Sequence, residues 1–223
     1  MNTLKFKTGI LALFLIICTS CKKEKNEPQD TAVTAEDLVA YNIRWIIINP
    51  DAKRDIRILY FNRDGNAIKA TLDGVDSRRV QPVHLLEDGF TFDLNGDGAV
   101  VYTLKLAKNE KGELSVANIK FYNINNPAYR IQEGSTAMLK TASIPSVKNK
   151  TFKEGDVILK FNVDTWLYGG VPNLTGTFYE IPGGWKGTLN GVDYMGLCVP
   201  VNGEIAMGFQ NNTDKYYRSF FTY

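Results

Sequence analysis

The chain has 223 residues, of which 26 are Lys or Arg and 24 are Asp or Glu. The two lysines of residues 1–20, Lys5 and Lys7, account for this small excess, so the remainder of the chain is neutral. A neutral body without a Lys/Arg-rich block lacks the clustered positive field that nucleic acids require, and we therefore expect no nucleic-acid partner. The 26 aromatic residues instead predict a large buried core.

Residues 1–20 have the layout of a secretory signal peptide. A positively charged start, a short apolar run over residues 9–18 and the small residues Thr19 and Ser20 lead to Cys21. The apolar run is about half as long as the ~20 residues that a membrane-spanning helix needs. We therefore expect a leader that is removed, not a permanent membrane span.

The tetrapeptide Cys-Thr-Ser-Cys over residues 18–21 resembles the bacterial lipobox, although Leu is usual at its first position. In that family the thiol of the final Cys is lipidated before the leader is cut. The resemblance implies that Cys21 carries the lipid, and stable anchoring takes more than one acyl chain. The mature protein would then be a domain held at a membrane by its lipid, without a span of its own.

Residues 21–37 are expected to form a flexible tether, because residues 22–33 are polar and charged, contain proline and lack apolar periodicity. The junction after Cys21 resembles envelope lipoproteins of the Bacteroidetes type, in which charged residues behind the lipidated Cys direct the protein to the cell surface. This resemblance implies a lipid-anchored outer-membrane protein at the cell surface, in preference to one that faces the periplasm. Asp-Thr-Ala at residues 30–32 also resembles the O-glycosylation site of that group, with Thr31 as the acceptor; an ordinary linker is the alternative.

The rest of the chain is predicted to be all-β, preceded by a short helix. Thr34 stands three residues before Asp37, which is a capping pattern for a helix that continues into Leu38 and Val39. Beyond Tyr41, alternating apolar residues and Gly-containing turns predict antiparallel strands. The expected strands cover residues 43–47, 56–60, 67–72, 89–94, 99–106, 113–122, 156–163, 175–181, 191–201, 204–209 and 216–223. Such a meander closes into a barrel or stacks as a sandwich, lipocalin-like in shape at most.

Two breaks in the pattern bear on domain organisation. Residues 123–127 and 141–151 are rich in Asn, Pro, Ser and Lys. They permit two parts, a β meander over 38–126 and a second β half over 127–223, or one domain. With Cys18 in the leader and Cys21 lipidated, one thiol is left, so no internal disulfide framework is expected.

One local string resembles the beginning of a calcium-binding loop. Asp93, Asn95 and Asp97 supply oxygen ligands at alternate positions before a glycine. The twelfth position of the loop is Leu104, where an EF-hand needs a bidentate Glu. A hairpin turn uses the same residue types, so we expect no cofactor and keep calcium as the weaker alternative.

The candidate ligand-binding residues are three aromatic side chains. Trp166, Tyr168 and Trp185 stand next to Gly and Pro residues in segments that we expect to be loops. Aromatic rings on loops, with Asn and Asp nearby, suit the faces of sugars or of other amphipathic ligands. The alternative is that the rings close the ends of a barrel or sandwich.

No catalytic residue is assigned. Cys198 lies in an apolar run, which favours an inert thiol, and a single His84 cannot build a multi-His zinc site. A hydrolase would need two carboxylates in one cleft, for which Glu180, Asp193 and Glu204 are candidates. The sequence leaves enzymatic activity open and favours a protein without it.

Three functions remain as hypotheses. The first is a non-catalytic binding module for a glycan or a small amphipathic ligand on a membrane-anchored lipoprotein. The second is a structural or accessory lipoprotein that acts through an envelope protein partner, and the third is the hydrolase with paired carboxylates. The fold alone does not separate these functions.

Overall fold

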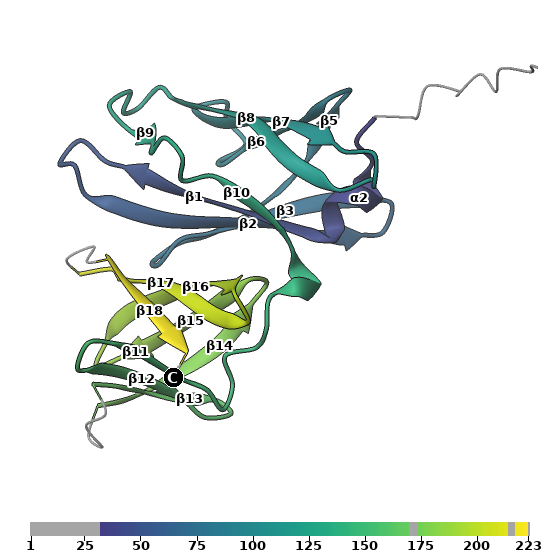
Figure 1. The fold of residues 1–223 in the computed structure, drawn as a ribbon. Helices are drawn as coiled ribbons and strands as arrows, with labels where there is room; N and C mark the ends of the chain where they lie inside the picture. Colours follow the sequence, from purple (N-terminus) through teal and green to yellow (C-terminus); the bar gives the residue numbers. More distant parts are fainter. Residues whose placement is uncertain (1–31, 170–173, 214–216, 223) are drawn as a thin grey trace, which may run out of the picture. The chain divides into compact units, whose positions relative to one another are not determined.

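Antiparallel β-strands make up most of the regular structure of the protein, as Figure 1 shows for a computed structural model that describes residues 32–169, 174–213 and 217–222. The all-β prediction is therefore confirmed. The predicted leader over 1–20, the lipidation residue Cys21 and the glycosylation residue Thr31 lie outside the described residues.

The predicted short helix is present as α2 (Ala35–Val39). The Thr34 side chain accepts a hydrogen bond from the Asp37 amide at 3.2 Å, and the Asp37 carboxylate accepts one from the Thr34 amide at 2.9 Å. This reciprocal capping starts the helix, and the fully buried Leu38 fixes it to the core. Within the part of the chain described, no helix is long and apolar enough to cross a membrane.

The first part of the chain folds into two sheets. The first sheet has the order β10-β1-β2-β3-β4, with β9 also paired to β1, and the second has the order β5-β6-β7-β8. The strands of the first sheet are β1 (Tyr41–Ile48), β2 (Arg54–Asp64), β3 (Ala67–Asp73), β4 (Arg78–Pro82), β9 (Arg130–Ile131) and β10 (Ala137–Lys140). Those of the second sheet are β5 (His84–Leu86), β6 (Gly89–Asp93), β7 (Val100–Lys108) and β8 (Leu114–Asn123).

These two sheets form a sandwich because alternate residues of both point into one core. The ring of Trp45 on β1 lies 5.3 Å from the ring of Tyr102 on β7, and the ring of Phe61 on β2 lies 5.2 Å from that of Phe90 on β6. All four side chains are at most 4% exposed. Aromatic pairs between the layers therefore help to hold the two sheets together.

Residues 127–140 belong to this sandwich by strand pairing. Ile131 pairs with Ile47, and β10 pairs with the start of β1. The change from one sheet system to the next therefore lies between β10 and Thr151, at the second predicted break, and not at the expected boundary of 126/127. A short 3-10 helix, η2 (Thr141–Ser143), lies in this connection.

The remaining strands form a closed barrel. They are β11 (Thr151–Glu154), β12 (Val157–Phe161), β13 (Thr165–Tyr168), β14 (Thr175–Ile181), β15 (Gly184–Leu189), β16 (Val192–Val201), β17 (Glu204–Asn211) and β18 (Tyr217–Thr222). Each strand pairs with the next in sequence, and β18 returns to pair with β11 (Figure 1). The sequence left barrel and sandwich as alternatives, and the chain contains one of each.

The interior of the barrel is filled by aromatic rings. The indoles of Trp166 and Trp185 have their ring centroids 5.0 Å apart, and Phe161 and Phe209 pack against both. Glycines on neighbouring strands leave room for the indoles. A Cβ on Gly196 would overlap the Trp185 indole nitrogen and lie 2.8 Å from its Cε2 atom.

Substitution of Gly196 by Ala is expected to destabilise the barrel by about 1–3 kcal/mol, because the added methyl group overpacks the core against Trp185. The same substitution made in a Trp185→Phe background should cost less, since the smaller ring frees that space. Denaturant unfolding of the two single variants and the double variant measures this coupling. An equal cost of Gly196→Ala in both backgrounds would contradict the packing account.

Candidate functional site

The structure does not place the predicted aromatic residues on ligand-binding loops. Trp166 lies on β13 and Trp185 on β15, and both are 0% exposed. Tyr168, at the end of β13, is half-buried, with its ring stacked on Phe209 at 6.0 Å. The prediction that these rings contact a ligand from loops is wrong for the two tryptophans, which form the barrel core.

Three glycines of the barrel strands make room for these indoles. Gly176, Gly187 and Gly196 lie within strands, and a Cβ on any of them would meet an indole nitrogen of Trp166 or Trp185. Small residues beside large rings are therefore a packing pattern here. The sequence shows the same neighbours for a loop and for a tightly filled barrel.

The carboxylate of Asp93 is engaged by its own turn. It accepts hydrogen bonds from the amides of residues 95, 96 and 98 at 3.2, 3.0 and 2.6 Å, and Asp97 accepts one from the amide two residues further on. Desolvation raises the pKa of Asp93, but these amide hydrogen bonds outweigh it and hold the pKa below its usual value. This geometry matches the hairpin-turn alternative. Among the described residues, no group of three or more His, Cys, Asp or Glu side chains could hold a metal ion.

The three candidate carboxylates are in different surroundings. Glu180 accepts hydrogen bonds from the Ser146 hydroxyl at 2.6 Å and the Val147 amide at 2.8 Å, which ties the connection before the barrel to β14. Glu204 is exposed at the start of β17. Asp193 lines the cleft described below. Cys198, as expected, is buried, and burial raises its pKa to about 12.

The sandwich and the barrel meet along an apolar seam. The outer face of β2 contributes Ile56 and Ile58, and the outside of the barrel contributes Ile181, Met195 and Leu197. All five side chains are at most 7% exposed. The contact belongs to one compact unit that spans Ala32–Tyr223.

A buried arginine forms hydrogen bonds across this seam. Arg44 on β1 donates to the Cys198 carbonyl at 2.6 Å, to the Gly183 carbonyl at 3.4 Å and to the Asn42 side chain at 2.8 Å. No carboxylate pairs with Arg44 in the part of the chain that the structure covers. Burial lowers its pKa to about 10. Gly183 has a φ of 92°, and a Cβ there would lie 2.6 Å from the guanidinium, so the site requires glycine.

A buried side-chain amide forms a second set of hydrogen bonds across the seam. Gln210 on β17 is 0% exposed, accepts a hydrogen bond from the Ile56 amide at 2.9 Å and donates one to the Arg54 carbonyl at 2.5 Å. Its side chain thus satisfies two backbone groups of β2 across the seam, as a neighbouring strand would. The polar contacts on either side of the apolar seam fix how the barrel docks on the sheet.

Next to this seam lies a cleft of about 370 Å³. The turn between β3 and β4 forms one wall, and β14, β15 and the start of β16 form the other. The lining residues are Val75, Asp76, Ser77, Arg78, Thr177, Phe178, Tyr179, Lys186, Gly187, Thr188 and Asp193.

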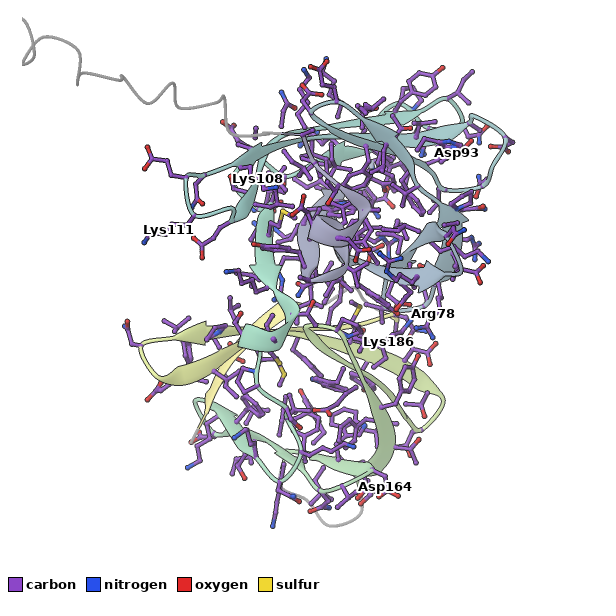
Figure 2. The ribbon with its side chains drawn as sticks, turned by 90° about the vertical axis from the view of Figure 1, so that its right-hand side faces the viewer. Arg78, Asp93, Lys108, Lys111, Asp164 and Lys186 are labelled. Atoms are coloured by element: carbon purple, nitrogen blue, oxygen red, sulfur yellow. The ribbon has the colours of Figure 1, made fainter. Side chains whose placement is uncertain are left out.

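A buried carboxylate organises the charged groups of the cleft. Asp73 is 0% exposed and accepts a hydrogen bond from the Tyr60 hydroxyl at 2.8 Å. It also forms ion pairs with Arg78 at 3.6 Å and with Lys186 at 3.5 Å. Lys186 donates further to the Ser77 carbonyl at 3.2 Å, which joins the two walls. Figure 2 shows Arg78 and Lys186 beside each other at this place.

Burial and the Asp73 carboxylate raise the pKa of two tyrosines near the cleft. Burial, followed by the charge of Asp73, raises the pKa of Tyr60 to about 12. Burial and then Asp73 also raise the pKa of Tyr179, which Arg78 lowers and Asp193 raises further. Negative charge therefore outweighs positive charge around the Tyr179 hydroxyl. The Tyr179 ring is 50% exposed and is the one large aromatic surface among the lining residues that faces solvent to this extent.

No sequence pattern indicates Asp73, Arg78, Tyr179 or Lys186 as site residues. A partial signal was present, since alternation along residues 175–181 puts Phe178 inside the barrel and Tyr179 outside it. The convergence of the turn after β3 with a barrel strand more than 100 residues later has no local signal. Sequence spacing could not have found the cleft.

No protein-family model, curated protein or solved structure matches this chain. The described residues define an all-β protein in which a sandwich and a closed barrel share a polar cleft. Its function has to be argued from the cleft and from the sequence.

Replacement of Arg44 by Met should destabilise the protein by about 1–3 kcal/mol, because the Cys198 carbonyl loses its 2.6 Å hydrogen bond from the guanidinium and the Gly183 carbonyl keeps only the Cys198 amide as donor within the described chain. Denaturant unfolding measures the loss. Arg63→Met is the control, because Arg63 pairs with Glu36 on the exposed surface and should change stability by less than about 1 kcal/mol. A loss for Arg44→Met as small as that of the control would show that the seam does not depend on the buried guanidinium.

Proposed function

We propose that this protein is a non-catalytic binding module for a glycan or a small amphipathic ligand, and that the cleft between the β3–β4 turn and β14–β16 is its binding site. One observation carries the proposal: the half-exposed Tyr179 borders a cleft whose two cations are paired with the buried Asp73. The cleft volume of about 370 Å³ lies within the range of roughly 300–1,000 Å³ that ligand sites occupy.

The cleft suits a ligand with both apolar and polar faces. The Tyr179 ring offers a flat apolar surface, while Lys186, Arg78 and Asp193 offer donors and acceptors on nearby walls. Lys186 and Arg78 are already oriented through Asp73, so less conformational entropy is lost when a ligand orders them. A preorganised mixture of a ring and hydrogen-bonding groups favours binding without requiring a chemical step.

The N-terminal sequence supports the second element of the proposal, which is attachment to a bacterial envelope. The leader-like residues 1–20 and the lipobox-like Cys21 favour a lipid anchor in the outer membrane, and the charged residues behind Cys21 favour the cell surface. Such a position would present the cleft to external ligands. An accessory lipoprotein that acts through an envelope protein partner is the alternative if the cleft binds no ligand.

The anchor is tested by expressing the full chain and its Cys21→Ser variant in a lipoprotein-processing bacterium. We expect mass spectrometry to find an acylated N-terminal Cys21 in the membrane fraction of the parent protein. The variant should lose the acyl chains and leave that fraction. An unacylated residue 21 in the parent protein would overturn the anchor while leaving the ligand proposal intact.

The binding site is tested by replacing Tyr179 with Ala. Loss of the ring should weaken binding of the best ligand from a glycan and small-amphiphile panel by about tenfold, since an aromatic contact contributes roughly 0.5–1.5 kcal/mol. Calorimetric titration measures the affinity, and analysis of the recovered ligand shows whether it remains intact. Tyr122→Ala is the matched control, because Tyr122 is 55% exposed on β8 and does not line the cleft.

Equal affinities of the parent and the Tyr179 variant would place binding elsewhere. A ligand that is recovered cleaved would favour the hydrolase. In that case Asp76 and Asp193 would be the carboxylates to test, because both line the cleft.

A further inference from the structure

The charge balance of the cleft narrows the class of ligand. Arg78 and Lys186 are the cations among its lining residues, and Asp76 and Asp193 are the carboxylates. The buried Asp73 adds a third negative charge directly behind the two cations. The site as a whole therefore carries slightly more negative than positive charge.

Both cations are committed to interactions within the protein. The Lys186 ammonium lies 3.5 Å from the Asp73 carboxylate and donates to the Ser77 carbonyl at 3.2 Å. The Arg78 guanidinium lies 3.6 Å from Asp73 and also donates to the Tyr60 hydroxyl. A bound anion would have to compete with a fully buried carboxylate for these groups.

Nearby charge outside the lining does not change this balance. Arg57 approaches the turn through a 3.4 Å contact with the Ser77 hydroxyl, but its guanidinium is paired with Asp55 at 2.5 Å. The net effect of the charged groups around Tyr179 is also to favour the neutral form of its hydroxyl. An incoming carboxylate, sulfate or phosphate would meet a net repulsion, because three carboxylates of the site outnumber its two cations.

A sugar hydroxyl meets no such penalty. Each hydroxyl is both a donor and an acceptor, so it can donate to Asp193 or Asp76 and accept from Lys186 or Arg78 without separating any ion pair. The apolar C–H face of a pyranose can lie on the exposed Tyr179 ring. The Thr177 and Thr188 hydroxyls, 3.4 Å apart on the same wall, extend the polar lining.

We propose that the cleft selects uncharged saccharides and discriminates against saccharides that carry carboxylate, sulfate or phosphate groups. This inference rests on the proposed function and specifies the ligand class of the same site. The selectivity comes from Asp76 and Asp193 on the walls together with Asp73 behind the cations.

The test compares matched pairs of disaccharides by calorimetry. The neutral probes are gluco-, galacto-, manno- and xylo-configured disaccharides, and the acidic probes are the uronic-acid and sulfated counterparts. We expect the parent protein to bind its best neutral probe at least about tenfold more tightly than the acidic counterpart. Binding of the neutral probe should change little with ionic strength, because no net charge is brought together.

A charge-neutralised variant then tests the cause of the selectivity. Asp76→Asn with Asp193→Asn removes two wall charges while keeping the side-chain shapes, and the preference for the neutral probe should shrink severalfold. Asp164→Asn is the control, an exposed carboxylate that Figure 2 shows well away from Lys186. A retained preference in the double variant would overturn the assignment to these two carboxylates.

The other outcomes separate the two proposals. Tighter binding of an acidic probe by the parent protein would overturn the ligand class and leave the binding function standing. If the parent protein binds none of the neutral or acidic probes, the selectivity is overturned, and binding of a non-saccharide amphiphile would keep the cleft as a site. Failure to bind any ligand of either panel would overturn both proposals.

Discussion

The buried guanidinium of Arg44 is the interaction on which the arrangement of the chain depends. A charge in a nearly dry environment is costly unless it is hydrogen-bonded, and here backbone carbonyls of Gly183 and Cys198 accept from the two terminal nitrogens of the guanidinium, while its Nε has no partner among the described residues. These acceptors exist only when the barrel lies against β1. This contact helps to fix the position of the seam, since a displaced barrel would leave the guanidinium with Asn42 of its own strand as its one remaining partner among the hydrogen bonds described above. The geometry of the cleft depends on the same contact, because one wall of the cleft belongs to the sandwich and the other to the barrel.

The fold was largely accessible from the sequence because its information is local. Alternation along strands such as β7, Gly-containing turns and the Thr34–Asp37 capping pair all act within a few residues. The same local patterns predicted the wrong position for Trp166 and Trp185, because glycine next to a large ring occurs both in loops and in tightly packed barrels. The distinction lies in which strand faces which, as in the contact between Gly196 and Trp185. Only pairing between strands resolves it.

The candidate site was inaccessible for a related reason. Asp73 and Lys186 are separated by 113 residues, and neither belongs to a motif. The sequence offers Asp193 as a candidate carboxylate, but its role in the cleft depends on the cations Arg78 and Lys186, which line the same cleft. The sequence predicted a ligand-binding protein mainly from two tryptophans that lie in the barrel core, and the structure offers the residues of the cleft for the same hypothesis. A protein whose chemistry comes from the meeting of two sheet systems will resist motif-based assignment in this way.

The pairing of β18 with β11 has a consequence for how the barrel is made. The opening strand has one partner, β12, until the final strand of the ring has emerged, so closure joins the most distant segments of this sheet. Contacts of such long sequence separation form late and slowly. During synthesis the incomplete ring would show two unpaired edges, which are templates for association with other chains. Loss of the last strand would therefore leave β11 and β17 without a partner on one side and favour aggregation.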